Sequence, residues 1–308
     1  KYLNLSYLKL NRLPRRRKID NFFMSPDNTL DKVKKLREIT GVGFKDCKSA
    51  IDETKGDIEK SIELLRKKGI AKASKRMGRT AAEGLICIYE NKNKFSMIEI
   101  NSETDFVAKN KEFINFAEEV SQLSLVASGK IENILKSKMK NKKNVEDNLV
   151  DLVSKIGEKI TLRRSAFLGD DKLLNFSYTH STIKKNIGKL GVLLSVDTTK
   201  EKKDIANLGK QLAMQVASSS PLAIEKEDLD PNILKKEKEI ITAELKNSEK
   251  DAKIVEKIAL GKLNKFIGEN TLLNQEWIME PKKKVRDVIK EFAGKDKFEI
   301  KEFVRFKI

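Results

Sequence analysis

The stretch Asn-Ser-Glu-Thr-Asp-Phe-Val-Ala-Lys-Asn-Lys-Glu-Phe, residues 101–113, joins two different hydrophobic patterns. Before it, apolar and polar residues nearly alternate over residues 95–100, which predicts a half-buried strand. After it, Phe113, Phe116 and Val120 recur at helical spacing, which predicts an amphipathic helix. At this point the chain is therefore expected to fold as a strand, a polar corner and a helix.

The corner contains Thr104, Asp105 and Phe106. Threonine and aspartate are favoured at helix starts, where their side chains accept hydrogen bonds from backbone amides that lack a partner within the helix. The phenylalanine has two interpretations: it packs into the core beside a capping aspartate, or it stands exposed as an anchor for a partner. Spacing alone favours the core, because single exposed apolar residues are common and need no function.

The composition describes a charged chain without a membrane-spanning pattern. Of its 308 residues, 39% are hydrophobic and 36% are charged, and the formal net charge is +18. No apolar run approaches the roughly 20 residues that cross a bilayer, so we expect no membrane partner. A basic chain can bind nucleic acid through its summed field. Here the lysines are scattered and aromatic residues are only 6%, which favours solvated surfaces over a nucleic-acid site.

The residues that usually carry catalysis or metal binding are rare. Cys47 and Cys87 are far apart in the sequence and form neither a disulfide framework nor a metal pair, so both are predicted to be core residues. His180 is the only histidine, and no glycine-rich phosphate loop is present. We therefore expect no cofactor, no metal and no enzyme.

The first residues are basic. Lys1–Met24 carries the run Arg15-Arg16-Arg17-Lys18 and has no acidic residue before Asp20. This is typical of the end of an organelle transit peptide, and a basic arm is the alternative. We expect residues 1–28 to be a basic leader or the remnant of a transit peptide, and the protein to work in the matrix or stroma of a mitochondrion or an apicoplast-like plastid.

Residues 29–69 predict three short helices, which Gly41, Gly43, Gly56 and Gly69 separate or end. Three helices in so short a segment resemble the ubiquitin-associated fold. So small a core is marginal, which suggests a tethered binding module. Residues 70–83 are predicted to be a linker.

The rest of the chain predicts two similar α/β subdomains with antiparallel sheets, residues 84–158 and 159–308, and hence an α+β fold. A strand, a polar corner and a helix occur over 97–120 and again over 193–216, which suggests a duplication. The second corner lacks the Asp-Phe pair. Residues 181–189 are expected to be a flexible loop.

A projecting coiled-coil hairpin of two antiparallel helices is predicted at about 231–267, because narrow apolar stripes run out from Pro231 and back to Gly268. The polar segment 247–252 is expected to form its tip and Gly268 to cap its end. Alternating residues from Phe298 to Ile308 then predict a closing strand.

The segment Thr104-Asp105-Phe106-Val107-Ala108-Lys109-Asn110 closely resembles the signature of the elongation factor Ts family. The similarity covers roughly Leu30 to Phe306, most of the chain. The other similar segments, in chain order, are residues 36–43, 46–48, 56–59, 81–84, 155–158, 163–164, 178–180 and 279–281.

The resemblance implies a guanine-nucleotide exchange factor for elongation factor Tu that acts by binding alone. It implies that Asp105 and Phe106, with Thr104 and Val107 beside them, enter the partner's nucleotide domain and disturb its Mg²⁺ and phosphate sites. A factor that binds the nucleotide-free partner better than the GDP form must, by reciprocity, lower its affinity for GDP. The expected partner is elongation factor Tu in both states, with no nucleotide bound directly to this chain.

The resemblance also implies further contacts with the partner, at Phe44, Lys45, Lys48, His180, Met214, Gln215 and Ile278. Met214 and Gln215 are expected to be exposed on a helix that faces the partner's third domain. The family commonly has two methionines where Phe44 and Lys45 stand. The 181–189 loop is also longer than in the bacterial pattern, and the family's C-terminal helical module is expected to be missing.

Two alternatives stay open. A basic RNA- or ribosome-associated protein would show a steep dependence of binding on salt. A ubiquitin-type adaptor would bind through residues 29–69 alone. Neither alternative needs the Asp105-Phe106 corner.

Overall fold

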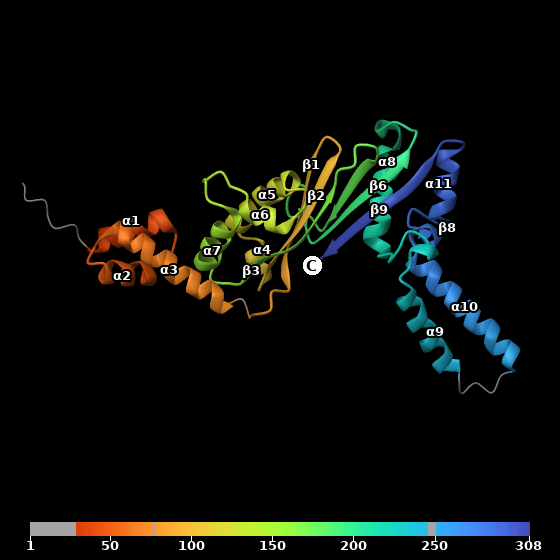
Figure 1. The fold of residues 1–308 in the computed structure, drawn as a ribbon, viewed down its shortest axis with the longest axis horizontal. Coiled ribbons are helices and arrows are strands. Elements are labelled where there is room, and N and C mark those ends of the chain that lie inside the picture. Colours follow the sequence, from red (N-terminus) through yellow and green to blue (C-terminus); the bar gives the residue numbers. More distant parts are fainter. Residues whose placement is uncertain (1–28, 77, 246–250) are drawn as a thin grey trace, which may run out of the picture. The chain divides into compact units, whose positions relative to one another are not determined.

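The computed structural model describes residues 29–76, 78–245 and 251–308, and Figure 1 labels their helices and strands. The chain divides into two compact units, one ending at Leu65 and the other beginning at Arg66. The predicted leader 1–28, and most of the predicted hairpin tip 247–252, lie outside the described residues.

The first unit contains α1 (Thr29–Thr40), α2 (Phe44–Glu53) and the start of α3 (Ile58–Arg76). This confirms the predicted three-helix, ubiquitin-associated-like module. Gly41 ends α1 with a φ of +65°, a conformation that glycine adopts at little cost. Six buried residues form its small core, which includes one of the two cysteines: Val33, Leu36, Cys47, Ala50, Ile51 and Leu65.

Helix α3 corrects the predicted linker. The sequence placed the end of this helix at Gly69, whereas α3 continues to Arg76. A glycine within a helix costs only about 1 kcal/mol relative to alanine, so packing can override it. A Cβ atom on Gly69 would lie 2.8 Å from Oγ of Ser154 in α7 (Val145–Ile156), so the glycine permits a close approach. Ala73 of the same helix is buried in the hydrophobic core of the second unit, which includes Leu85 and Phe113.

The first sheet has the strand order β3-β2-β1-β5, and all of its pairs are antiparallel. Its strands are β1 (Glu83–Asn91), β2 (Lys94–Ser102), β3 (Ile160–Leu168) and β5 (Ile187–Gly188). The predicted hairpin of β1 and β2 is confirmed. Strand β3 lies after the predicted subdomain boundary at residue 158, yet it pairs with β2, so the first sheet crosses that boundary. The predicted 181–189 loop contains β5, which pairs with Ile86 and Cys87.

The second sheet has the order β4-β6-β9 and is also antiparallel. Its strands are β4 (Leu174–His180), β6 (Leu190–Thr198) and the predicted closing strand β9 (Phe298–Lys307). A two-stranded ribbon, β7 (Glu276–Trp277) and β8 (Glu280–Lys284), precedes α11 (Val285–Ala293).

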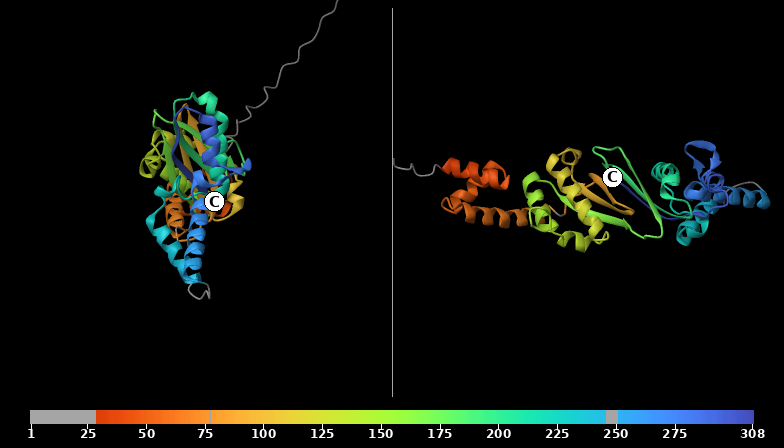
Figure 2. Two further views of the ribbon diagram at one scale, coloured as in Figure 1. Left: turned by 90° about the vertical axis from the view of Figure 1, so that its right-hand side faces the viewer. Right: turned by 90° about the horizontal axis from the view of Figure 1, so that it is seen from above.

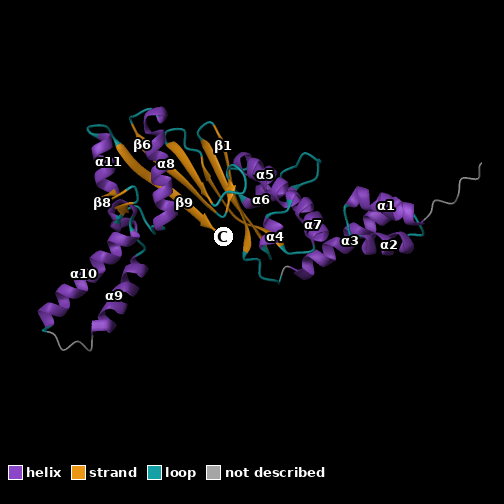
Figure 3. Cartoon of the chain, turned by 180° about the vertical axis from the view of Figure 1, so that it is seen from behind, coloured by secondary structure: helices purple, strands orange, loops and turns teal. Residues whose placement is uncertain are grey.

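Both sheets are buried on both faces, which makes four layers in the second unit. On one face of the first sheet, Leu85 and Ile98 pack with Phe113 of α5 (Lys111–Val126). Its other face packs against the second sheet through a cluster that includes Met97, Leu193 and Phe306. The far side of the second sheet is covered by α8 (Lys202–Ser219) and α11, and Figure 3 shows the strands between these helix layers.

The predicted helical hairpin is confirmed as α9 (Pro231–Leu245) and α10 (Ala252–Asn270), and Figure 2 shows it extending from the rest of the second unit. Helix α10 runs through Gly268 to Asn270, so the predicted glycine cap is wrong. Two short 3-10 helices, η1 (Lys226–Asp228) and η2 (Leu272–Asn274), flank its base. There Ile267 packs with Ala223 and Leu229.

Candidate functional site

The corner between β2 and α5 is a separate helix of four residues, α4 (Asp105–Ala108). Its residues divide by burial. Val107 and Ala108 belong to the core under the first sheet, and their side chains are 5% and 1% exposed. Phe106 points the other way and is 78% exposed. The second, similar corner leads from β6 to α8 without such a helix.

The exposure of Phe106 settles the first choice that the sequence left open. A core phenylalanine is ruled out, because most of this side chain lies in solvent. An exposed aromatic ring on a short, well-anchored helix is a large apolar surface that becomes buried only when another molecule covers it. The corner is therefore a candidate docking site.

Asp105 does not cap the helix, which the core interpretation had expected. Its Oδ2 accepts a hydrogen bond from Nζ of Lys109 at 2.7 Å, one turn further along. This bond, together with the charges of Lys109 and Lys189, holds the pKa of Asp105 below its usual value. The carboxylate is therefore ionised at neutral pH, beside the exposed ring.

Thr104 precedes α4 at the N-cap position, but its hydroxyl makes no capping bond. Instead, its Oγ1 donates to Oε1 of Glu158 at 2.8 Å, and its backbone N–H donates to Oε2 of the same carboxylate at 3.0 Å. Thr104 thus ties the corner to the end of α7 and does not present its side chain to a partner.

Glu103 anchors the same corner from its other side. Its Oε1 accepts the backbone N–H of Lys159 at 2.6 Å, and its Oε2 lies 3.3 Å from Nη1 of Arg79. The backbone bond from Lys159 is the main reason that the pKa of Glu103 lies below its usual value. The carboxylate of Glu158 thus holds Thr104, and the carboxylate of Glu103 holds the neighbouring residue's side of the corner. These two contacts fix the position from which Phe106 projects.

Three of the predicted contact residues come together elsewhere in the second unit. His180, Met214 and Ile278 line one pocket of about 250 Å³. Nδ1 of His180 lies 3.0 Å from the hydroxyl oxygen of Tyr178, which lines the same pocket. Since these residues come from β4, α8 and the β7–β8 ribbon, their meeting could not be read from sequence spacing.

Gln215 was expected to be exposed, and this is wrong because its side chain is fully buried. Its Oε1 accepts the backbone N–H of Ile278 at 2.9 Å. Its Nε2 donates to the carbonyl of Glu276 at 3.1 Å and to Oε1 of Gln275 at 3.2 Å. Gln215 therefore holds the β7–β8 turn, which carries Ile278, against α8, and its side chain cannot reach a partner.

Phe44, Lys45 and Lys48 lie in the first unit, on α2. All three are exposed, with Phe44 at 42%. Phe44 is the first residue of the helix and stands outside the core that Cys47 and Ala50 form. The alternative of core packing for Phe44 is therefore not supported.

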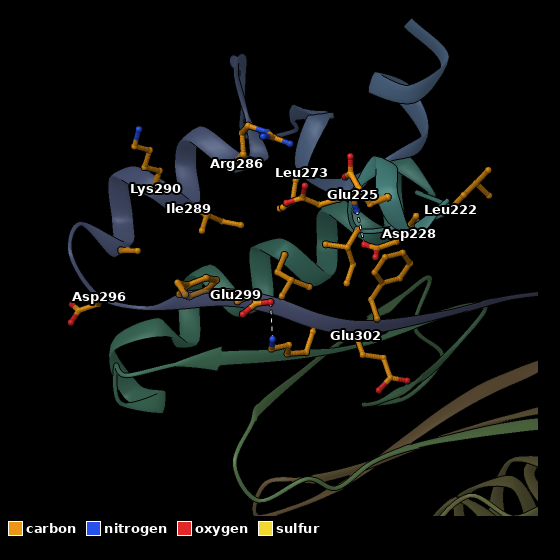
Figure 4. Close-up of a pocket in the computed structure, with 18 of the residues that line it drawn as sticks. Leu222, Glu225, Asp228, Leu273, Arg286, Ile289, Lys290, Asp296, Glu299 and Glu302 are labelled. Carbon is orange, nitrogen blue, oxygen red and sulfur yellow. Dashed lines mark hydrogen bonds and ion pairs between the residues drawn. The ribbon is translucent and has the colours of Figure 1, made fainter. Parts of the chain in front are cut away.

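A larger pocket of about 1100 Å³, shown in Figure 4, contains none of the predicted site residues. Arg286 and Lys290 of α11 line one wall, while Glu299 and Glu302 of β9 line another. No local motif in the sequence indicated it, because its lining combines residues 222–228 with Leu273 and with residues of α11 and β9.

Within the described ranges, no three His, Cys, Asp or Glu side chains are grouped so that they could hold a metal ion. The described helices also include none that is both long and apolar enough to span a bilayer. Cys47 and Cys87 are free and buried, as predicted.

An exposed aromatic ring beside an ion pair, on a corner fixed by carboxylate contacts, defines a protein-docking module. The family model described as "Elongation factor TS" matches residues 103–308, beginning at the residue that anchors the corner. The chain is 42% identical over 263 residues to elongation factor Ts of Nitrobacter hamburgensis, covering 85% of each chain. It is 43% identical over 269 residues to the factor of Bartonella quintana, covering 87% of this chain and 86% of the relative. The chain belongs to the elongation factor Ts family and is a bacterial-type factor of translation elongation.

Proposed function

We propose that this protein is the guanine-nucleotide exchange factor of a bacterial-type elongation factor Tu. It binds the GDP form, perturbs the Mg²⁺ and phosphate site, and promotes release of GDP by binding alone, without covalent chemistry. Family membership supports the partner. The exposure of Phe106, 78% on an anchored corner, is the observation that carries the mechanism.

The corner residues divide into two roles in this proposal. Phe106 inserts into the nucleotide domain of the partner, and the negatively charged Asp105 contacts the same domain. Thr104 and Val107 act indirectly, because Thr104 is bonded to Glu158 and Val107 is buried. The energy of burying the ring is gained only after the partner has moved, so it favours the open, nucleotide-free state.

The other surfaces give the complex its affinity. His180, Met214 and Ile278 form one contact around their shared pocket, with Gln215 behind them as a support. Phe44, Lys45 and Lys48 form another on α2. Lys45 supplies an ionic contact where the family has a methionine.

The test is release of a fluorescent GDP analogue from a cognate elongation factor Tu at moderate salt. The intact protein should accelerate release strongly, and Phe106→Ala should lose most of that acceleration while staying folded. Val126→Ala is the matched control, since Val126 is 83% exposed and lies outside the corner. If the intact protein does not accelerate release, the proposal fails.

We also propose that the protein works inside a eukaryotic organelle, a mitochondrion or a plastid. The basic, acid-poor Lys1–Met24 supports this. Immunofluorescence of the endogenous protein, with organelle markers, should place it inside a mitochondrion or a plastid. Its location in the cytosol would contradict the proposal.

A further inference from the structure

The segment between α6 (Ile131–Lys136) and α7 concentrates positive charge that composition alone shows as scattered. No acidic residue lies between Glu132 and Glu146. Residues 136–144 are called the lysine loop here. Its five lysines are all exposed: Lys136, Lys138, Lys140, Lys142 and Lys143.

Backbone hydrogen bonds and one buried side chain fix the conformation of the lysine loop. The backbone N–H of Met139 donates to the carbonyl of Lys143 at 2.8 Å, and that of Lys142 donates to the carbonyl of Met139 at 2.8 Å. The side chain of Met139 is 7% exposed and packs in the core beside α5. Because the methionine turns inward, the lysines on either side of it turn outward.

Most of these charges are not neutralised. Lys143 pairs with Asp151 at 2.7 Å. Among the described residues, Lys136, Lys138, Lys140 and Lys142 form no ion pair. The carboxylate of Glu119 accepts the backbone N–H of Lys140 at 2.5 Å, but its side chain pairs with none of these four ammonium groups. Four unpaired ammonium groups within seven residues therefore concentrate positive charge on this part of the surface.

Lys142 also has an unfavourable backbone conformation, with a φ of +68°. Asparagine and glycine adopt this left-handed conformation more easily than lysine. Asparagine here would be expected to favour the turn but would remove one charge from the loop. The single substitution Lys142→Asn is therefore expected to lower the charge of the loop and to raise its stability.

We propose that the lysine loop binds the phosphate backbone of RNA. A fixed row of ammonium groups fits a chain of phosphates, and residues 136–144 contain no aromatic side chain that could stack on bases, so binding is independent of sequence. A lipid surface fits less well, because the one large apolar side chain of the loop, Met139, is buried and cannot insert. This surface is separate from the Phe106 corner and goes beyond the exchange function.

The first test compares two triple variants of the full chain by fluorescence anisotropy with a labelled single-stranded RNA. One carries Lys138→Gln, Lys140→Gln and Lys142→Asn. The control carries Lys235→Gln, Lys236→Gln and Lys238→Gln on α9, which removes the same charge from exposed positions elsewhere. At about 0.7 per phosphate contact, the slope of log K against log salt should fall by about 2 in the first variant only. Its affinity at low salt should fall by about tenfold, since loss of the contacts removes their counterion release.

The second test uses two single variants with the same chemical change. Lys142→Asn and Lys92→Asn each replace a left-handed lysine, since Lys92 has a φ of +55°. Both should raise the melting temperature, and only Lys142→Asn should weaken RNA binding.

An equal loss of RNA affinity in both triple variants would overturn the proposal, because it would show that RNA responds to the diffuse positive charge of the whole protein. Loop-dependent binding to phosphatidylserine vesicles, with RNA binding unaffected by the loop changes, would overturn it in favour of a membrane. The loop variants should accelerate the release of GDP from elongation factor Tu as strongly as the unaltered protein does, which keeps this test independent of the exchange function.

Discussion

The ammonium nitrogen of Lys189 lies 2.6 Å from Oε2 of Glu83, and this ion pair connects the two candidate contact regions. Glu83 is opposite Ser102 in the register of β1 and β2, directly before the corner. The backbone N–H of Lys189 donates to the carbonyl of His180 at 3.2 Å, beside the pocket. The corner and the pocket therefore lie at the same end of the second unit, where one partner can contact both.

The charge of Lys189 reaches Asp105 but acts less strongly than that of Lys109. Lys109→Gln should raise the pKa of Asp105 toward its usual value, because it removes the hydrogen bond that is the main cause of the lowering. Lys189→Gln should raise it by less, since only a Coulombic contribution is lost. Carboxyl chemical shifts followed through an acid titration would measure both. A larger effect from Lys189 would contradict the geometry.

The Asp105–Lys109 ion pair predicts a pH dependence of stability. Because the pKa of Asp105 is lower in the folded state, its stabilisation is fully present above the unfolded value and is lost as pH falls through the folded value. Asp105→Asn should therefore be less stable than the unaltered protein at pH 7, and the two should converge in acid. Urea unfolding at both pH values tests this, with Lys109→Gln as the partner variant. If the difference in stability between Asp105→Asn and the unaltered protein persists in acid, it has a cause other than the ionisation of Asp105.

Phe106 and Val107 are neighbours with opposite expected effects on stability. Phe106→Ala should change the free energy of unfolding by no more than about 0.5 kcal/mol, because the side chain is mostly exposed. Val107→Ala should cost about 2 kcal/mol, because it removes buried methyl groups and leaves a cavity. Denaturant unfolding followed by circular dichroism would compare them. A large loss from Phe106→Ala would mean that the ring packs against its own chain.

Gln215→Leu should destabilise the second unit by about 2–4 kcal/mol, because it leaves the N–H of Ile278 and the carbonyl of Glu276 without their partner. Gln211→Leu, one turn earlier on α8 and only partly buried, is the control and should cost much less. Both can be measured by urea unfolding. Equal costs would show that the buried amide contributes nothing specific.

Neither cysteine should react with a thiol reagent in the native protein. Burial raises the pKa of Cys47 and of Cys87, so both thiols stay protonated as well as inaccessible. Ellman's reagent should detect both thiols only in guanidinium chloride. Rapid labelling of Cys87 in the native state would require opening of the first sheet, where it pairs with Ile98.

Elements defined by local patterns were predictable from the sequence. The three helices of the first unit, the β1–β2 hairpin, the α9–α10 hairpin and β9 each follow a clear hydrophobic period. The predicted end of α3 at Gly69 was wrong because the glycine allows a close approach to Ser154, a residue 85 positions away. Local rules favour a helix end at a glycine, but they contain no information about a contact with a distant residue.

The candidate site was predictable at the corner and less so elsewhere. Phe106 was named because the motif is contiguous, although spacing alone favoured its burial. Gln215 was misplaced because a polar residue in an amphipathic helix is expected at the surface, and its partner Ile278 is 63 residues away. The role of Lys189 was missed for the same reason, since its ion pair with Glu83 spans 106 residues.

Because α4 has only four residues, the corner must keep a fixed length. Each helical residue turns the chain by about 100°. One inserted or deleted residue would therefore rotate the side chains of α4 relative to the core. Phe106 would turn inward and a core residue would turn out. Anyone who transplants this corner to another strand–helix junction must therefore preserve its residue count from Ser102 to Asn110 as strictly as its chemistry.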